Sequence, residues 1–214
     1  MIDLVLATRN AHKVQEIQDI LGNGFRVQSL KQYPSAPELI EDANTFAGNA
    51  TRKAMQLARW LDKPEVLVLA DDSGLEVDAL DGAPGVHSAR FAATDATKGN
   101  SPDSANTDKL LRVLRDVPAE KRTARFRCVL ALVAGASVQT FDGACEGRIA
   151  LQPSGSGGFG YDPVFIPTGH SKSFAELGED IKNQISHRAR ALQKLKAYFN
   201  SLSQARAASI RPKV

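Results

Sequence analysis

The chain has 214 residues, 43% of them hydrophobic and 24% charged, which is enough to bury a core as one or two domains of an ordinary globular protein. Its 27 basic and 24 acidic residues nearly balance, so net charge gives no reason to expect binding to nucleic acid. The sequence shows neither a basic leader nor the ~20-residue apolar run of a membrane span, which predicts a cytoplasmic protein without a membrane partner. Cys128 and Cys145 form no CxxC pair and are predicted to be buried free thiols.

The first predicted unit is a strand followed by a helix. Residues 2–7 form a short apolar run, and residues 11–21 carry apolar side chains at helical spacing. Thr8, Asn10 and Lys13 therefore lie at the junction, where free N–H groups and the helix dipole favour a phosphate. Lys13 would add a positive charge there. The glycines of a Walker loop are missing, and N-capping by Thr8 or Asn10 is the alternative interpretation.

A second strand is predicted at residues 25–30 and a second helix at residues 45–61. The loop between them carries three acids, Glu38, Glu41 and Asp42. Acids just before a helix are favoured by its dipole, but they also suit a metal site. Asn49 and Lys53 lie four residues apart and share one face of the helix. Their side chains either face the same cleft as these acids or face solvent.

Two adjacent carboxylates, Asp71 and Asp72, follow a buried strand at residues 66–69. Successive strand positions point to opposite sides, so we expect the two side chains to differ in role. One is predicted to face a cleft at the strand end, and the other to fix the turn that follows. Acids at the carboxyl end of a strand favour a divalent cation. An Asx turn closed by Gly74 is the alternative.

The second half of the chain predicts a helix at residues 106–117 and then three strands at residues 124–133, 138–141 and 144–150. Turns at Gly135 and at Asp142–Gly143 would make these strands a β-meander. The order of strands and helices favours an α/β fold with a mixed sheet and helices on its faces. The chain from Ser203 onward is predicted to be a frayed basic tail.

Two further stretches favour a ligand. The glycine-rich loop at residues 154–163 offers backbone N–H groups together with the rings of Phe159 and Tyr161. Ser186 is predicted to cap the last helix, which places His187 and Arg188 in its first turn. The helix dipole disfavours cations there, so a basic pair at this position favours an anionic or acceptor-rich ligand.

Taken together and in order, six stretches resemble the inosine triphosphate pyrophosphatase family: residues 6–13, 45–50, 70–75, 82–90, 157–163 and 185–188. The resemblance implies an elongated mixed sheet with two lobes around a central cleft, one domain over residues 1–202, and a homodimer. It also implies Mg²⁺-dependent hydrolysis of ITP, dITP and XTP to the monophosphate and pyrophosphate.

The resemblance also assigns roles to residues. Asp72 is implied as a metal ligand and proton acceptor, and Glu41 as the second metal ligand. Ala43 stands where the family usually has glycine, so Glu38 and Asp42 stay open as alternatives to Glu41. The residues implied to bind the substrate are Thr8, Arg9, Asn10, Ala11, His12, Lys13, Ser73, Phe159, Gly160, Tyr161, Asp162, Lys182, His187 and Arg188.

This assignment agrees with the chemistry of the residues. Splitting a phosphoanhydride requires charge neutralisation and a positioned water, which a metal, carboxylates and Lys13 supply. Donors such as Arg188 would pair with the C6 carbonyl of hypoxanthine or xanthine and be left unpaired by the amino group of adenine. A nucleotide-binding regulator without turnover is the alternative function. A glycosidase with paired carboxylates is disfavoured by the many cations.

Overall fold

The computed structural model describes residues 1–94 and 99–209. One mixed sheet of six strands runs through them in the order β2-β1-β3-β4-β5-β6. Parallel pairing joins β1 to β2 and β3, whereas the remaining neighbours are antiparallel. The predicted mixed sheet is therefore confirmed. The strands are β1 Ile2–Leu6, β2 Phe25–Ser29, β3 Leu67–Val77, β4 Thr123–Ala134, β5 Ser137–Ile149 and β6 Phe165–Pro167.

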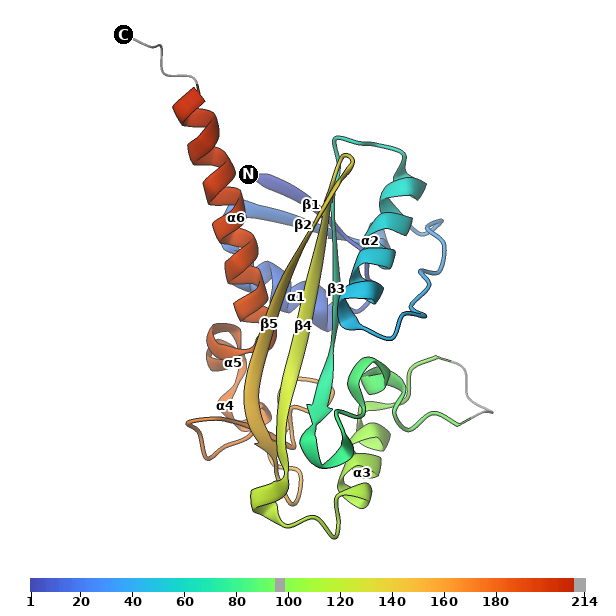
Figure 1. The fold of residues 1–214 in the computed structure, drawn as a ribbon, viewed down its shortest axis with the longest axis vertical. Helices are drawn as coiled ribbons and strands as arrows, with labels where there is room; N and C mark the ends of the chain where they lie inside the picture. Colours follow the sequence, from blue (N-terminus) through green and yellow to red (C-terminus); the bar gives the residue numbers. More distant parts are fainter. Residues whose placement is uncertain (95–98, 210–214) are drawn as a thin grey trace.

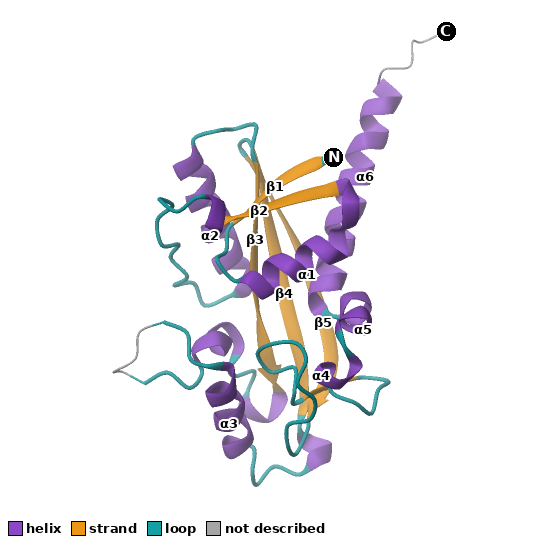
Figure 2. Ribbon diagram, turned by 180° about the vertical axis from the view of Figure 1, so that it is seen from behind, coloured by secondary structure: helices purple, strands orange, loops and turns teal. Residues whose placement is uncertain are grey.

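Helices cover both faces of this sheet. One face packs against α2 (Phe46–Leu61), and the other packs against α1 (Ala11–Leu21) and α6 (His187–Ser209). A third apolar cluster fills the far end of the molecule, between the ends of β3 to β6, α3 (Asp103–Val113) and α4 (Phe174–Leu177). A short α5 (Glu179–Ile185) leads into α6. The two ends are joined by the long strands β3 to β5, which gives the predicted elongated shape (Figures 1 and 2).

The prediction that the strand ends before Asp71 is wrong. β3 continues through the polar stretch to Val77, and each of its residues from Asp71 onward has a partner on β4. Asp, Ser and Gly favour turns only when no better pairing is available to their backbone. Here the neighbouring strand supplies that pairing, so the carboxylates lie in the middle of a strand and project from opposite faces.

The predicted turn at Asp142–Gly143 is also wrong, because β5 is one continuous strand that forms a hairpin with β4 around Gly135. Gly143 is needed there for packing and not for a turn. A Cβ on Gly143 would lie 2.1 Å from the carbonyl oxygen of His187 and 2.6 Å from the amide nitrogen of Ala191. The glycine therefore lets the backbone of α6 lie directly on the sheet.

The helices agree with the sequence more closely than the strands do. Residues 11–21 are helical as predicted, with Asn10 as the N-cap. The helix predicted at residues 45–61 begins at Phe46, because Thr45 is its N-cap. α6 extends through Ser209 and so includes the first part of the expected tail, whereas 210–214 lie outside the described residues. Cys128 and Cys145 are buried free thiols, as predicted. No helix in the described ranges has the length and apolar character to cross a membrane.

Candidate functional site

The site is built on the part of β3 that β1 does not cover. Pairing with β1 stops at the Leu6–Leu69 pair, whereas pairing with β4 continues to Val77. A 3₁₀ helix at Gly85–Arg90 covers the far part of this free edge, where the Leu75 N–H donates to Ser88 Oγ at 2.8 Å. The edge near Asp71 and Asp72 lies between these two covers, with the start of α1 on one side and α2 on the other.

Asp71 projects toward α1 and α6 and is 1% exposed. Its carboxylate accepts hydrogen bonds from Arg188 Nε at 2.9 Å and from Lys13 Nζ at 2.5 Å. Burial by itself raises the pKa of Asp71, but the charges of Arg188 and Lys13 outweigh it and hold the pKa well below the usual range. Asp71 therefore stays ionised and fixes the position of two predicted substrate-binding cations: Lys13, predicted to bind phosphate, and Arg188, predicted to bind the base.

The ion pairs continue from Arg188 to the glycine-rich loop. Glu16 of α1 is 7% exposed and pairs with both Arg188 and Lys182, with its Oε1 at 2.6 Å from Lys182 Nζ. Lys182 Nζ lies in turn 2.5 Å from Asp162 Oδ2. Three cations and three carboxylates thus alternate through the interior. Glu16 was not among the predicted site residues, and its only signal in the sequence is its position one helical turn after Lys13.

Asp72 projects from the opposite face of β3, toward α2, and is 6% exposed. Its Oδ1 lies 3.1 Å from Lys53 Nζ, and Lys53 Nζ is also 3.1 Å from Glu41 Oε2. Burial raises the pKa of Asp72, against the lowering effect of Lys53. Its Oδ2 is buried and has no hydrogen-bond partner among the described residues. Glu41 is thus the acid that reaches this site, while the carboxylate of Asp42 pairs with Arg52.

The glycine-rich loop is held by its own side chains. Asp162 Oδ2 accepts the N–H of Phe159 at 2.8 Å, and the Tyr161 hydroxyl donates to the carbonyl oxygen of Ser88 at 2.9 Å. The Gly160 N–H donates to Asp103 Oδ2 at 2.7 Å. Asp162 and Tyr161 are therefore buried supports of the loop, and Asp103 is a contact that was not among the predicted site residues.

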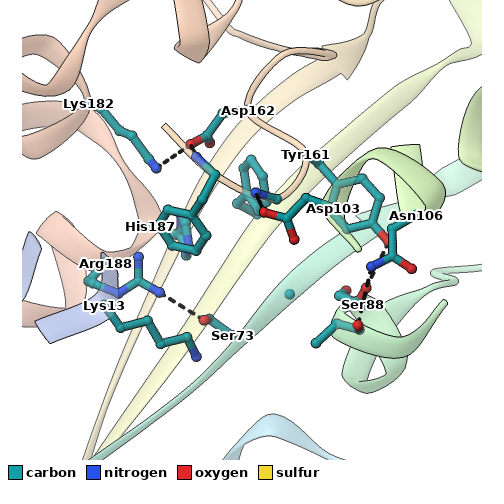
Figure 3. A pocket seen from close by; sticks show the side chains of 15 residues that line it. Lys13, Ser73, Ser88, Asp103, Asn106, Tyr161, Asp162, Lys182, His187 and Arg188 are labelled. Carbon is teal, nitrogen blue, oxygen red and sulfur yellow. Dashed lines mark hydrogen bonds and ion pairs between the residues drawn. The ribbon is translucent and has the colours of Figure 1, made fainter. Parts of the chain in front are cut away.

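A pocket lies between this loop, β3 and the start of α6 (Figure 3). Arg188 Nη2 donates to Ser73 Oγ at 2.9 Å across one wall. Phe126, which the sequence placed in a strand without a role, also lines the pocket. Nine of the residues predicted to bind substrate meet here: Lys13, Ser73, Phe159, Gly160, Tyr161, Asp162, Lys182, His187 and Arg188.

His187 is not a cation in this setting. It is 4% exposed and stacks on Phe126, with ring centroids 4.8 Å apart and 15° between the planes. Burial, with the nearby charges of Arg188 and Lys182, lowers the pKa of His187 well below its usual value. The two residues were predicted to be a basic pair. Arg188 is a cation as predicted, whereas the lowered pKa makes His187 neutral.

The remaining predicted residues lie at the start of α1, outside the residues that line the pocket. Thr8 Oγ1 accepts the N–H of Asn10 at 3.2 Å, and Asn10 Oδ1 accepts the N–H of Lys13 at 3.1 Å. The capping interpretation is thus confirmed for Asn10, whereas Thr8 bonds the amide of the cap residue and is not itself the cap. Arg9 donates to the carbonyl oxygen of Ala36 at 2.8 Å, while Ala11 and His12 are exposed.

Comparison with known proteins identifies the family of the chain. The Ham1 family model matches residues 4–198. The chain belongs to the Ham1 family. It is 51% identical over 197 residues to the dITP/XTP pyrophosphatase of Shouchella clausii, covering 92% of this chain and 96% of the relative. It is 50% identical to the dITP/XTP pyrophosphatase of Geobacillus kaustophilus, covering 91% of this chain and 93% of the relative.

Solved structures of this family share the fold. A HAM1 protein from Coxiella burnetii superposes with a TM-score of 0.81 at 36% identity, covering 94% of this chain and all 100% of the other. The Ham1 protein of Staphylococcus aureus gives a TM-score of 0.79 at 34% identity, with 93% and 98% covered. The elongated mixed sheet with helices on both faces is thus a fold of the Ham1 family.

Proposed function

We propose that this protein hydrolyses dITP, ITP and XTP to the nucleoside monophosphate and pyrophosphate. The observation that carries the proposal is the pairing of two sites across the free edge of β3. On one face lies a pocket with the ring of Phe159 and the cations Lys182 and Arg188. On the other face lie Asp72 and Glu41 around Lys53. The dITP/XTP pyrophosphatases at about half identity support the same assignment.

The proposed selectivity rests on hydrogen-bond donors at the base. Arg and Lys side chains donate and cannot accept, so Arg188 and Lys182 suit the C6 carbonyl of hypoxanthine or xanthine. The amino group at C6 of adenine would leave such a buried donor unpaired. A site that depends on one hydrogen bond can reject the mismatched group by about 10⁴-fold. The Phe159 ring offers the base a stacking surface.

We propose Mg²⁺ as the cofactor, held by Asp72 and Glu41. The support is the buried Oδ2 of Asp72, which lacks a hydrogen-bond partner among the described residues, together with an all-carboxylate donor set. When bound, the ion would neutralise charge on the phosphates. Lys13 would hold the triphosphate at the start of α1. Asp72 would accept the proton of the attacking water.

We also propose that the protein acts as a homodimer in the cytoplasm, with residues 1–202 forming one two-lobed domain. The support is the resemblance of the six sequence stretches to a dimeric family. Light scattering coupled to size-exclusion chromatography tests the dimer, and a mass near 23.0 kDa, that of one chain, would contradict it.

The activity is tested by incubating the protein with dITP, XTP, dATP or dGTP and Mg²⁺ and separating the products. We expect monophosphate and pyrophosphate from dITP and XTP, no turnover in EDTA, and recovery when Mg²⁺ is restored. Release of orthophosphate, or equal rates on dATP and dITP, would refute the assignment. Tight binding of dITP without turnover would instead indicate a nucleotide-binding regulator.

A further inference from the structure

The ring of Phe159 is the point at which three helices meet the glycine-rich loop. His12, in the first turn of α1, stacks against it with ring centroids 5.3 Å apart and 19° between the planes. Lys182 of α5 places its Nζ 4.5 Å from the centroid of the same ring, and Arg188 of α6 places its Cζ at 5.9 Å. The position of this ring is therefore shared between the loop and its neighbours.

The loop backbone by itself does not fix the ring. Gly158 and Gly160 flank Phe159 with φ of +73° and +63°. The N–H groups of Phe159 and Gly160 are tied to Asp162 and Asp103, so the backbone is anchored. These bonds leave the direction of the side chain to whatever it packs against. Lys182 and Arg188 are already held by buried carboxylates, whereas the exposed His12 reaches the ring from the first turn of α1.

His12 also lies next to Lys13, at the start of α1 where the triphosphate is proposed to bind. The stacked pair therefore connects the phosphate end of the site to its base end. We propose that His12 is a positioning residue for the base: it holds the Phe159 ring in the orientation on which the purine stacks, and makes no contact with the phosphates. This inference rests on the proposed function and specifies how the base end of the site is built.

Four variants test it: His12→Ala, His12→Phe, Phe159→Ala and the double variant His12→Ala/Phe159→Ala. Loss of an aromatic pair should weaken binding of a base that depends on that pair by about 3- to 10-fold. We expect His12→Ala to raise KM for dITP by about this factor, with kcat within about twofold, and His12→Phe to restore KM. In the Phe159→Ala background, His12→Ala should have no further effect on KM. Gln15→Ala, an exposed position on the same helix whose side chain bonds Asp19, is the matched control.

Inorganic tripolyphosphate separates the base from the phosphates. It carries the phosphate chain alone, so its inhibition constant against dITP hydrolysis should be the same for His12→Ala and the parent protein. A weaker inhibition in His12→Ala, in parallel with the higher KM, would place His12 on the phosphates and overturn the proposal. A fall in kcat with unchanged KM would overturn it as well.

A measurement without nucleotide keeps this test independent of the proposed activity. The ring protons of His12 should be shifted upfield by the Phe159 ring in the NMR spectrum, and Phe159→Leu should remove that shift. Absence of the shift would refute the stacked arrangement in solution. If the shift is present but the parent protein does not cleave dITP, the proposed function fails, and the role of His12 in positioning the base fails with it.

Discussion

Asp71 and Asp72 are neighbours in the sequence, yet the structure predicts opposite consequences for the same isosteric change. Asp71→Asn removes one carboxylate from a buried set of ion pairs, between Arg188 and Lys13. Asp72→Asn removes one from a site that holds Lys53 and has an oxygen without a partner among the described residues. We expect the first variant to be less stable and the second to be stable but inactive.

The magnitudes follow from the contacts. Removing one partner of a buried ion pair costs about 3–5 kcal/mol, and we expect the lower end because Arg188 keeps Glu16. At this chain length, each kcal/mol lowers Tm by about 2–4 °C, so Asp71→Asn should lower it by roughly 6–12 °C. In Asp72→Asn the amide oxygen can still accept from Lys53, and the lost charge was already disfavoured by burial. We therefore expect the free energy of unfolding of Asp72→Asn to lie within about 1 kcal/mol of that of the parent protein.

Thermal unfolding followed by circular dichroism measures the stability of both variants, and pyrophosphate release from dITP measures activity. Asp72→Asn should lose about 10²–10⁴-fold in kcat, as expected for removal of a proton acceptor. Equal losses of Tm in the two variants would show that the faces of β3 do not differ as described. Normal turnover by Asp72→Asn at saturating Mg²⁺ would mean that another acid carries the chemistry.

Three further changes test separate parts of the structure. The pKa of His187 is far below 6.5 in the folded protein, so between pH 7.5 and 5.5 only the unfolded chain protonates this imidazole. The free energy of unfolding should therefore fall by about 1.4 kcal/mol over that range. In urea titrations, His187→Gln should lack that loss. Gly143→Ala should cost about 3 kcal/mol or more, since its Cβ would meet backbone atoms, whereas Gly24→Ala, with open space around it, should cost less than about 1 kcal/mol in the same titrations. Tyr161→Phe should cost about 1 kcal/mol in thermal unfolding by removing the bond to the carbonyl of Ser88, and an unchanged Tm would contradict that bond.

Features that depend on near neighbours in the chain could be predicted from sequence. The helical spacing of apolar residues located α1 and α2, and the residue before the last helix, Ser186, does cap it, with its Oγ accepting the N–H of Ala189 at 3.2 Å. The two-residue period of a strand correctly separated Asp71 from Asp72. The order of the six stretches led to the family. The roles of the predicted substrate and metal residues stay predictions until the variants are measured.

Other features depend on residues that are distant in the sequence, and only the folded chain brings these together. Glu16 meets Arg188 across 172 positions, and Lys53 joins Glu41 to Asp72. The same holds for the continuation of β3 through its polar stretch, which pairing with β4 decides. The charge state of His187 could not be predicted from its helix position, because it is set by burial against Phe126 and by two neighbouring cations. Hydrophobic period is a local property of the chain, whereas ion pairing and proton affinity depend on distances that only packing determines.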